Sequence, residues 1–469
     1  MMEALTRPKL SPTRLAAYYL ALLAGGALIF WLVNQSGQHL QAGGPALGFG
    51  SGAHKENSLI ARLLLSLAVI SASSQALGKL MARIGQPPVM GEVLGGILLG
   101  PSLLGWLWPQ ASTLLFAPDV TGAIGILARI GVILYMFFVG LELDLELLRH
   151  QGKSTLLISH ASIVVPFSLG TLLSLWLFPI YGGPDVPFHV FTLFLGVSMS
   201  ITAFPVLARI LTDQNMQRTR LGALALTCAA IDDVTAWCLL ACVLAVATAS
   251  PWLAAQTLVL SATFVVGVLA ILRPLLRRVT GNWQDRRQDL AIVLACSLLT
   301  AACTDAIGIH ALFGAFLLGT VIPHDSKLAK SLMGHLNTLV GLLLLPCFFA
   351  FTGLRTSIGL VQGPQAWLVV AAVIAAACIG KFGGTWMAAR MAGLKNREAA
   401  SLGVLMNTRG LMELIVLNLG LELKILSPTL FTIFVLMALA TTFSTTPILM
   451  RLRRGETDQP VNLEVVRPA

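Results

Sequence analysis

Two adjacent aspartates, Asp232 and Asp233, lie in an apolar segment long enough to cross a membrane. They come about 13 residues after Arg220, and a helix rises about 1.5 Å per residue, so they would lie about 20 Å into a hydrocarbon core about 30 Å thick. Two ionised carboxylates at that depth are costly, and burial favours a bound proton on at least one of them. The pair predicts a proton-binding site. An aspartate that caps a helix break beside a structural ion pair is the alternative.

A lysine lies at the same predicted depth. Lys381 precedes Arg390 by nine residues, which places it roughly 14 Å from the nearer membrane interface. Successive residues of a helix point about 100° apart, so Lys381 can pair with one aspartate while the other faces a cavity. A lysine whose ammonium group reaches the membrane surface is the alternative.

Two of the apolar segments are interrupted. Pro205 lies near the middle of 187–212, and proline removes a hydrogen bond from the helix ladder. Asn407 and Thr408 interrupt 397–421 at a similar depth. Non-helical backbone is tolerated within a membrane where it is buried in protein or lines a cavity. The two breaks together predict a site at mid-membrane, whereas either one alone is consistent with an ordinary kink.

A second ion pair is predicted beside the second break. Arg409 and Glu413 are four residues apart, which is the spacing of neighbours on a helix surface. We expect them to neutralise each other and to stabilise a locally unwound segment. Direct handling of an ion by Glu413 is the alternative.

The elements that must hold these residues are membrane-spanning helices. Only 11% of the 469 residues are charged and the mean hydropathy is +0.82, whereas a soluble chain carries about a quarter charged residues. We predict an all-α polytopic membrane protein with about 14 transmembrane helices. The predicted spans are 15–34, 57–79, 88–106, 121–147, 154–178, 187–212, 219–247, 252–273, 288–305, 308–323, 331–355, 365–391, 397–421 and 427–450.

Lysines and arginines orient these spans. With the N-terminus inside, 24 of the 31 basic residues lie in loops or at span ends on one side and three on the other, while Arg62, Arg129, Lys381 and Arg409 lie deeper within spans. An excess of basic residues marks the cytoplasmic side. Both termini are therefore predicted to be cytoplasmic, in a bacterial plasma membrane. The net charge of +10 then reflects topology and not nucleic-acid binding.

The two interrupted spans occupy equivalent positions in a repeat. Each is the second member of a triplet of spans, and the two triplets are seven spans apart. An odd offset means that the triplets cross the membrane in opposite directions, as inverted repeats do. Paired broken helices in inverted repeats indicate a transporter's substrate site near the middle of the membrane.

Several stretches resemble a known family. From about residue 57 the chain is similar to the monovalent cation:proton antiporter-2 family, especially to its cation/proton exchanger branch in plants and fungi. The matching stretches are GPSLLG (100–105), FFVGLELD (137–144), SITAFPVLARIL (200–211), DDVTAW (232–237) and MNTRGLMELIVLN (406–418). The resemblance implies the sodium/proton antiporter fold with two broken, crossing helices. It also implies a homodimer in which a mobile core domain moves against a panel of dimer-side helices.

The resemblance also implies residue roles. Asp233 matches the carboxylate that binds both cation and proton, and Thr202 matches the threonine of the cation site. Lys381 matches the basic residue that pairs with the first carboxylate, here Asp232. Members of the branch often have Asn before the key Asp. Because Asp232 takes that place, we expect electrogenic exchange, with one-for-one exchange as the alternative.

Three regions are expected along the chain. Residues 1–56 form an N-terminal cytoplasmic tail, an extra helix and an outer loop; 57–450 form the exchanger domain; and 451–469 form a short cytoplasmic tail. Many members of the family carry a long cytoplasmic regulatory domain, and we expect none in 451–469.

The predicted function is secondary active antiport of a monovalent cation, K+ or Na+, against protons. Its partners are the cation, protons, the lipid bilayer and a second copy of the chain, with no nucleic acid, no cofactor and no metal beyond the transported cation. A sodium-coupled symporter of an organic anion on a related fold is the main alternative, and a passive channel is a further one. An enzyme is not expected, because the histidines lack catalytic spacing: His160, His189, His310 and His324.

Overall fold

The computed structural model describes residue 31 and residues 52–142, 153–216, 219–247, 251–276, 287–322 and 326–453. The chain divides into two units after Ser58, and the helices that carry the site belong to the second unit, which begins at Leu59. The N-terminal tail, the predicted first span (15–34) apart from residue 31, and most of the C-terminal tail lie outside the described residues.

A first group of helices contains the elements before α8 and those between α11 and α18. Within it α15 packs on α6, and α17 packs on both α3 and α6. Its members are α2 (Gly52–Arg83), α3 (Pro88–Leu99), α4 (Leu104–Leu107), α5 (Pro109–Leu115), α6 (Pro118–Glu142), α12 (Pro251–Gly267), η1 (Val268–Leu272), α14 (Arg287–Ile307), α15 (Ala311–Val321), α16 (Lys327–Leu339), η2 (Val340–Leu344) and α17 (Leu345–Arg355).

A second group contains the two predicted triplets. Here α8 packs on α9, α11 and α19, while α22 packs on α18, α20 and α21. A single 3-10 turn, η3 (Ile358–Leu360), leads from the first group into it. Its members are α8 (Lys153–Tyr181), α9 (Phe188–Ser200), α10 (Phe204–Asp213), α11 (Arg220–Ala247), α18 (Gly363–Cys378), η4 (Ile379–Gly383), α19 (Gly384–Met391), α20 (Asn396–Met406), α21 (Leu411–Glu422) and α22 (Pro428–Leu452).

Glycines set the close packing of the first group. A Cβ on Gly353 of α17 would lie 2.0 Å from the carbonyl carbon of Gly96 on α3. A Cβ on Gly140 of α6 would lie 3.0 Å from the Cα of Gly319 on α15. Helices in membranes associate where small residues let their backbones approach. The stretch FFVGLELD thus has a packing role, because it supplies Gly140.

The structure confirms the predicted helical membrane architecture but not the count of 14 spans. Among the described residues, 11 helices are long and apolar enough to cross a membrane, or 12 if the bent pair of α20 and α21 is one span. The predicted span 308–323 appears only as the shorter helix Ala311–Val321. It is short because Gly308 and His310 have positive φ angles and separate it from α14.

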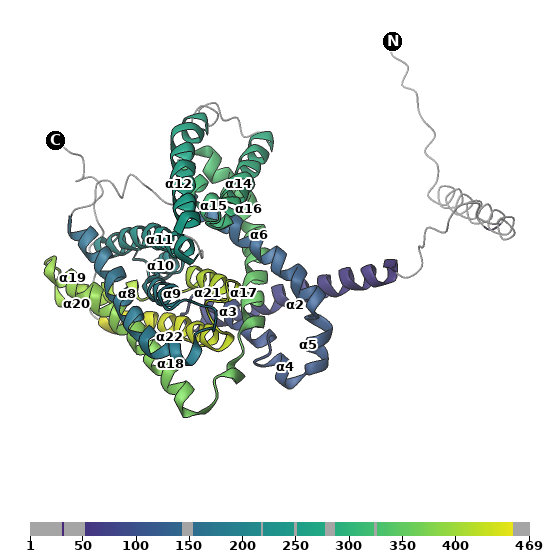
Figure 1. Ribbon diagram of the computed structural model, residues 1–469, viewed down its shortest axis with the longest axis horizontal. Helices are drawn as coiled ribbons and strands as arrows, with labels where there is room; N and C mark the ends of the chain where they lie inside the picture. Colours follow the sequence, from purple (N-terminus) through teal and green to yellow (C-terminus); the bar gives the residue numbers. More distant parts are fainter. Residues whose placement is uncertain are drawn as a thin grey trace, which may run out of the picture. The chain divides into compact units, whose positions relative to one another are not determined.

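Both predicted helix breaks are present: α9 and α10 are separate helices, and so are α20 and α21 (Figure 1). Residues 201–203 are not helical, and Pro205 lies in the first turn of α10, where proline is favoured because no helical hydrogen bond is lost there. Residues 407–410 separate α20 from α21, whose axes are bent by 42°. The backbone N–H of Ala203 donates to the carbonyl of Thr408 at 3.0 Å. The two broken helices therefore cross at their unwound segments.

Candidate functional site

Five charged side chains are buried among the described residues, and all five lie around the two breaks. At most 2% of each is exposed. Three are acids and two are bases, so full ionisation leaves one negative charge in excess. A buried charge needs a partner. The five residues are Asp232, Asp233, Lys381, Arg409 and Glu413.

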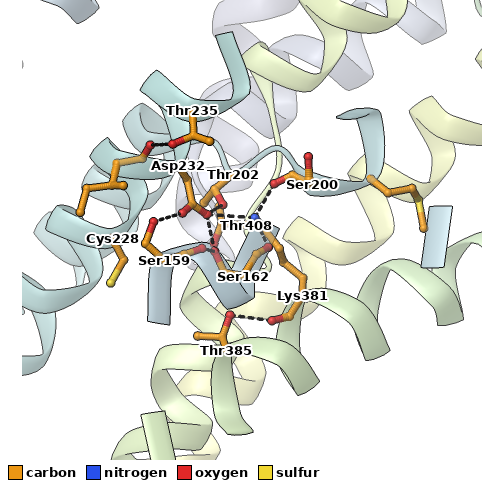
Figure 2. A network of polar contacts seen from close by, with 12 residues as sticks. Ser159, Ser162, Ser200, Thr202, Cys228, Asp232, Thr235, Lys381, Thr385 and Thr408 are labelled. Carbon is orange, nitrogen blue, oxygen red and sulfur yellow. Dashed lines mark hydrogen bonds and ion pairs between the residues drawn. The ribbon is translucent and has the colours of Figure 1, made fainter. Parts of the chain in front are cut away.

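Asp232 lies at the centre of a polar network (Figure 2). Its Oδ1 accepts a hydrogen bond from Ser159 Oγ at 2.6 Å. Its Oδ2 accepts from Ser162 Oγ at 2.5 Å and from Thr202 Oγ1 at 2.9 Å, and lies 3.0 Å from Lys381 Nζ. The donors come from α8, from the first break and from η4. Asp232 is thus the aspartate that Lys381 contacts.

Lys381 is held on three sides. Besides Asp232, its Nζ donates to the carbonyl of Ser162 at 2.9 Å and to that of Ser200 at 2.5 Å. It projects from the π-helical turn η4, and such wide turns within α-helices often occur at functional sites. The three acceptors match the three N–H groups of an ammonium ion.

Asp233 has a different environment. Neither of its carboxylate oxygens has a hydrogen-bond partner among the described residues, although the backbone amide of Phe204 at the start of α10 interacts with it. It lines a small pocket of about 10 Å³ together with Ile201 of the first break and Met412 of α21. That volume is near the least that accommodates one water-sized particle. Among the described residues, Asp233 is thus the buried acid whose carboxylate accepts no hydrogen bond from a side chain.

Arg409 and Glu413 form a separate buried pair. Arg409 Nη1 lies 2.7 Å from Glu413 Oε2. The four-residue spacing predicts both residues on one helix, but Arg409 lies in the unwound segment before α21. The guanidinium also donates to the carbonyls of Ser198 and Met199 at 2.9 and 2.5 Å. These carbonyls belong to the last turn of α9, where a positive charge is favourable.

The remaining predicted residues lie at the second break. Thr408 Oγ1 donates to the carbonyl of Leu405 at 2.7 Å, which caps α20. Asn407 Nδ2 donates to Cys378 Sγ at 3.5 Å, and Asn407 Oδ1 is buried without a partner among the described residues.

Ser159 and Ser162 were not predicted from the sequence. They are three residues apart on α8, so they share one face of the helix. The sequence feature that could have indicated them is a pair of serines at this spacing in the span before the first break. It is a weak one, because serine in a membrane helix usually bonds to its own backbone.

A larger cavity of about 330 Å³ opens between the two groups of helices. Its walls come from α6, α14, α15 and α17 of the first group and from α21 of the second. Arg129, Asp305 and Glu422 give it a charged lining. Both this cavity and the small pocket at Asp233 are lined by α21, through Ile415 and Met412 respectively.

Known proteins resemble this chain in sequence and in fold. The sequence matches the family model of the transmembrane sodium/hydrogen exchangers over residues 67–451. The fold resembles that of the sodium proton antiporter MjNhaP1 from Methanocaldococcus jannaschii, with a TM-score of 0.61 and 15% identity, over 86% of this chain and 98% of that one.

Curated relatives are more similar in sequence. The chain is 42% identical to the Na+/H+ antiporter NhaS4 of Synechocystis over 396 residues, which cover 83% of this chain and 97% of the relative. It is 39% identical to cation/H+ antiporter 18 of Arabidopsis thaliana, over 82% of this chain and 48% of the relative. It is 35% identical to K+/H+ antiporter 1 of Saccharomyces cerevisiae, over 77% and 43%. The chain thus spans about half the length of these two eukaryotic relatives.

Proposed function

Because the chain belongs to the sodium/hydrogen exchanger family, we propose that it exchanges a monovalent cation, Na+ or K+, for protons, and that the two compete for Asp233. One observation carries this proposal: the five buried charged side chains of the described residues are three carboxylates and two bases, and Asp233 is the carboxylate among them that accepts no hydrogen bond from a side chain. Either a proton or a monovalent cation supplies the missing positive charge. Because a buried charge without compensation is costly, the site favours holding one of the two.

The proposed cation site draws its other ligands from the first break. Na+ and K+ take oxygen ligands, and unwound backbone in broken helices supplies them in transporters. Thr202 donates its hydroxyl proton to Asp232, which leaves the lone pairs of its oxygen free to face an ion. The carbonyls of Ile201 and Thr202 lie in the break between α9 and α10, whereas that of Ala203 accepts the first hydrogen bond of α10. These neutral oxygens would complete the shell around an ion at Asp233.

Alternating access follows from the two groups of helices. The second group holds all five buried charges, and the cavity of about 330 Å³ lies between it and the first group. We propose that the second group is the mobile core and that it moves against the first, so that Asp233 faces each side of the membrane in turn.

The relatives favour antiport over the other readings. All those compared are named as antiporters, for Na+, for K+ or for cations. That supports antiport over sodium-coupled symport of an organic anion, and a transporter over an enzyme. The many apolar helices make this an integral membrane protein.

Location and assembly complete the proposal. The sorting of basic residues supports cytoplasmic termini, and we propose the plasma membrane of a bacterium as the location. The likeness to the exchanger branch supports a homodimer, which the first group of helices would form.

Proteoliposomes test the proposed exchange. Purified protein is reconstituted with a pH-sensitive dye inside, and Na+ or K+ is then added outside. We expect the lumen to become alkaline as protons leave in exchange for the cation, with no change in protein-free vesicles. Cation uptake that needs an organic anion, or that proceeds without opposing proton movement, would contradict antiport.

A further inference from the structure

Asp232 accepts hydrogen bonds from three hydroxyl groups in addition to its ion pair with Lys381. Three hydroxyls and one ammonium group converge on its two oxygens, at 2.5 to 3.0 Å (Figure 2). Ser159 and Ser162 supply two of them, and both serines are fully buried. A network of this kind is built for an acceptor and not for a carboxylic acid.

We propose that Ser159 and Ser162 hold Asp232 as a permanently charged carboxylate paired with Lys381, so that only Asp233 changes its protonation. Exchange is then one proton for one cation. This inference rests on the proposed antiport and specifies its stoichiometry. The two serines are positioning residues, since they act on the transported ions only through Asp232.

The hydrogen-bond inventory opposes a proton on Asp232. A proton on Oδ2 would replace an acceptor by a donor in a place where three other donors already point. Ser162 Oγ also lies 2.9 Å from the carbonyl of Ser159, but the carboxylate at 2.5 Å is charged and is the stronger acceptor. The charged form of Asp232 therefore satisfies the network best.

The hydrogen-bond partners of Lys381 likewise favour its protonated form. A neutral amine has two N–H groups and one lone pair, and three acceptors surround this nitrogen. Deprotonation would set the lone pair against a carbonyl or carboxylate oxygen. None of the three acceptors around Lys381 Nζ comes from the other titratable groups near the pair. These groups are Asp233, Cys228, Arg409 and Glu413.

The count of buried charges gives the same stoichiometry. With Asp232, Glu413, Lys381 and Arg409 charged, one proton or one cation at Asp233 makes the core neutral. A second proton on Asp232 would leave a net positive charge buried in the core. The structure thus favours one-for-one exchange, whereas the adjacent aspartates in the sequence had suggested electrogenic exchange.

A membrane potential applied to symmetric vesicles tests the inference. Proteoliposomes contain the same Na+ concentration and pH inside and outside, and a thiocyanate gradient imposes the potential. Exchange of two protons for one cation would let 100 mV drive about a 50-fold displacement of the ion gradients. One-for-one exchange moves no net charge, so we expect no change of luminal pH.

Variants assign the effect to the serines. In Ser159→Ala together with Ser162→Ala, Asp232 loses two donors and can take up a proton, so we expect the potential alone to move protons. The single variants serve in its place if the double variant does not fold. Ser168→Ala is the matched control, because Ser168 lies exposed on the same helix and bonds to its own backbone.

Each outcome is decisive. A cation gradient that moves no protons in the wild type would refute the antiport itself. Antiport that responds to the potential in the wild type would overturn the permanent charge on Asp232. Serine variants that exchange ions yet remain as insensitive to potential as Ser168→Ala would overturn the role of the serines.

Discussion

Asp232 and Asp233 are neighbours in sequence and equally buried, yet the fold gives them different environments. Because they point about 100° apart on α11, Asp232 faces α8 and Lys381, while Asp233 faces the pocket at the two breaks. One carboxylate is paired and the other has no hydrogen-bond partner among the described residues. The pair thus divides into a structural anion and a proposed carrier of ions.

Thr202 donates to Asp232 and is proposed to supply an oxygen to the cation at Asp233. Thr202→Val keeps the shape of the side chain but removes its oxygen from the proposed cation shell, so we expect the apparent KM for the cation to rise about fivefold, consistent with the loss of one hydrogen-bonding oxygen at about 1 kcal/mol. The maximal rate should fall less. Thr202→Ser is the control and should keep a KM near that of the wild type. An unchanged KM in Thr202→Val would place the cation elsewhere.

The charged residues of the site could be predicted from the sequence because charge is rare in apolar spans and expensive there. The partners of Asp232 could not. Ser159 and Ser162 look like any helix serine, and Ser168 on the same helix bonds to its own backbone. Only the position of α8 against α11 decides which hydroxyls reach the carboxylate.

The C-terminal end of α9 explains where the two buried basic side chains lie. Lys381 and Arg409 donate to the carbonyls of three successive residues at the end of α9, Ser198, Met199 and Ser200. A helix C-terminus carries a partial negative charge and unpaired carbonyls. Two side chains from distant spans thus replace the hydrogen bonds that the break removes from α9.

The Arg409 contacts predict a large effect on stability. Arg409→Leu leaves Glu413 and two carbonyls buried without partners, so we expect the free energy of unfolding to fall by about 3–5 kcal/mol. Arg209 and Asp213 form a matched pair with the same spacing that is exposed on α10, and Arg209→Leu should cost only about 0.3–0.5 kcal/mol. Thermal unfolding in detergent compares the two. Equal melting temperatures would show that the buried pair is not stabilising.

The two breaks could be predicted from the sequence, but their exact position could not. Pro205 indicated the first break, yet the unwound residues are 201–203 and the proline begins α10. Proline is compatible with a first helical turn, so it marks the start of the second half of the span. The second break lies where predicted, because the Thr408 hydroxyl forms a local hydrogen bond to the carbonyl of Leu405 that competes with the helix.

On the scale of the whole unit, an ion cluster joins the two groups of helices beside the larger cavity. Glu422 at the end of α21 lies 3.0 Å from Arg129 of α6 and 3.2 Å from Arg355 of α17. Arg355 also stacks over the ring of Phe351, 4.0 Å from its centroid. If the second group moves against the first, the contacts of Glu422 with Arg129 and Arg355 must break during each cycle.

A cross-link tests that movement. In a variant whose seven native cysteines are replaced, Arg129→Cys and Glu422→Cys are joined by a short bifunctional thiol reagent. We expect the cross-link to stop exchange and a cleavable linker to restore it. Cross-linking Arg209→Cys to Asp213→Cys within α10 is the control and should not stop exchange. Undiminished exchange with the first cross-link in place would show that the two groups move together.

The number of membrane spans follows less directly from the sequence than their helical nature does. The hydropathy pattern predicted helices at nearly all positions where the described residues have them, but 308–323 was assigned as a full span and the helix there is Ala311–Val321. Apolar runs report burial in protein as well as in lipid, and much of this short helix is packed against α6 and α14. Its length is limited by Gly308 and His310, whose positive φ angles separate it from α14.

The competition between cation and proton at Asp233 is tested most directly by proton release. Purified protein in weakly buffered detergent solution is mixed with Na+ or K+, and the pH is recorded. We expect the wild type to release protons as the cation binds, and Asp233→Asn to release none, because an amide has no proton to exchange. Asp119→Asn, which changes an exposed carboxylate, should behave as the wild type. Equal proton release from Asp233→Asn and the wild type would contradict the account.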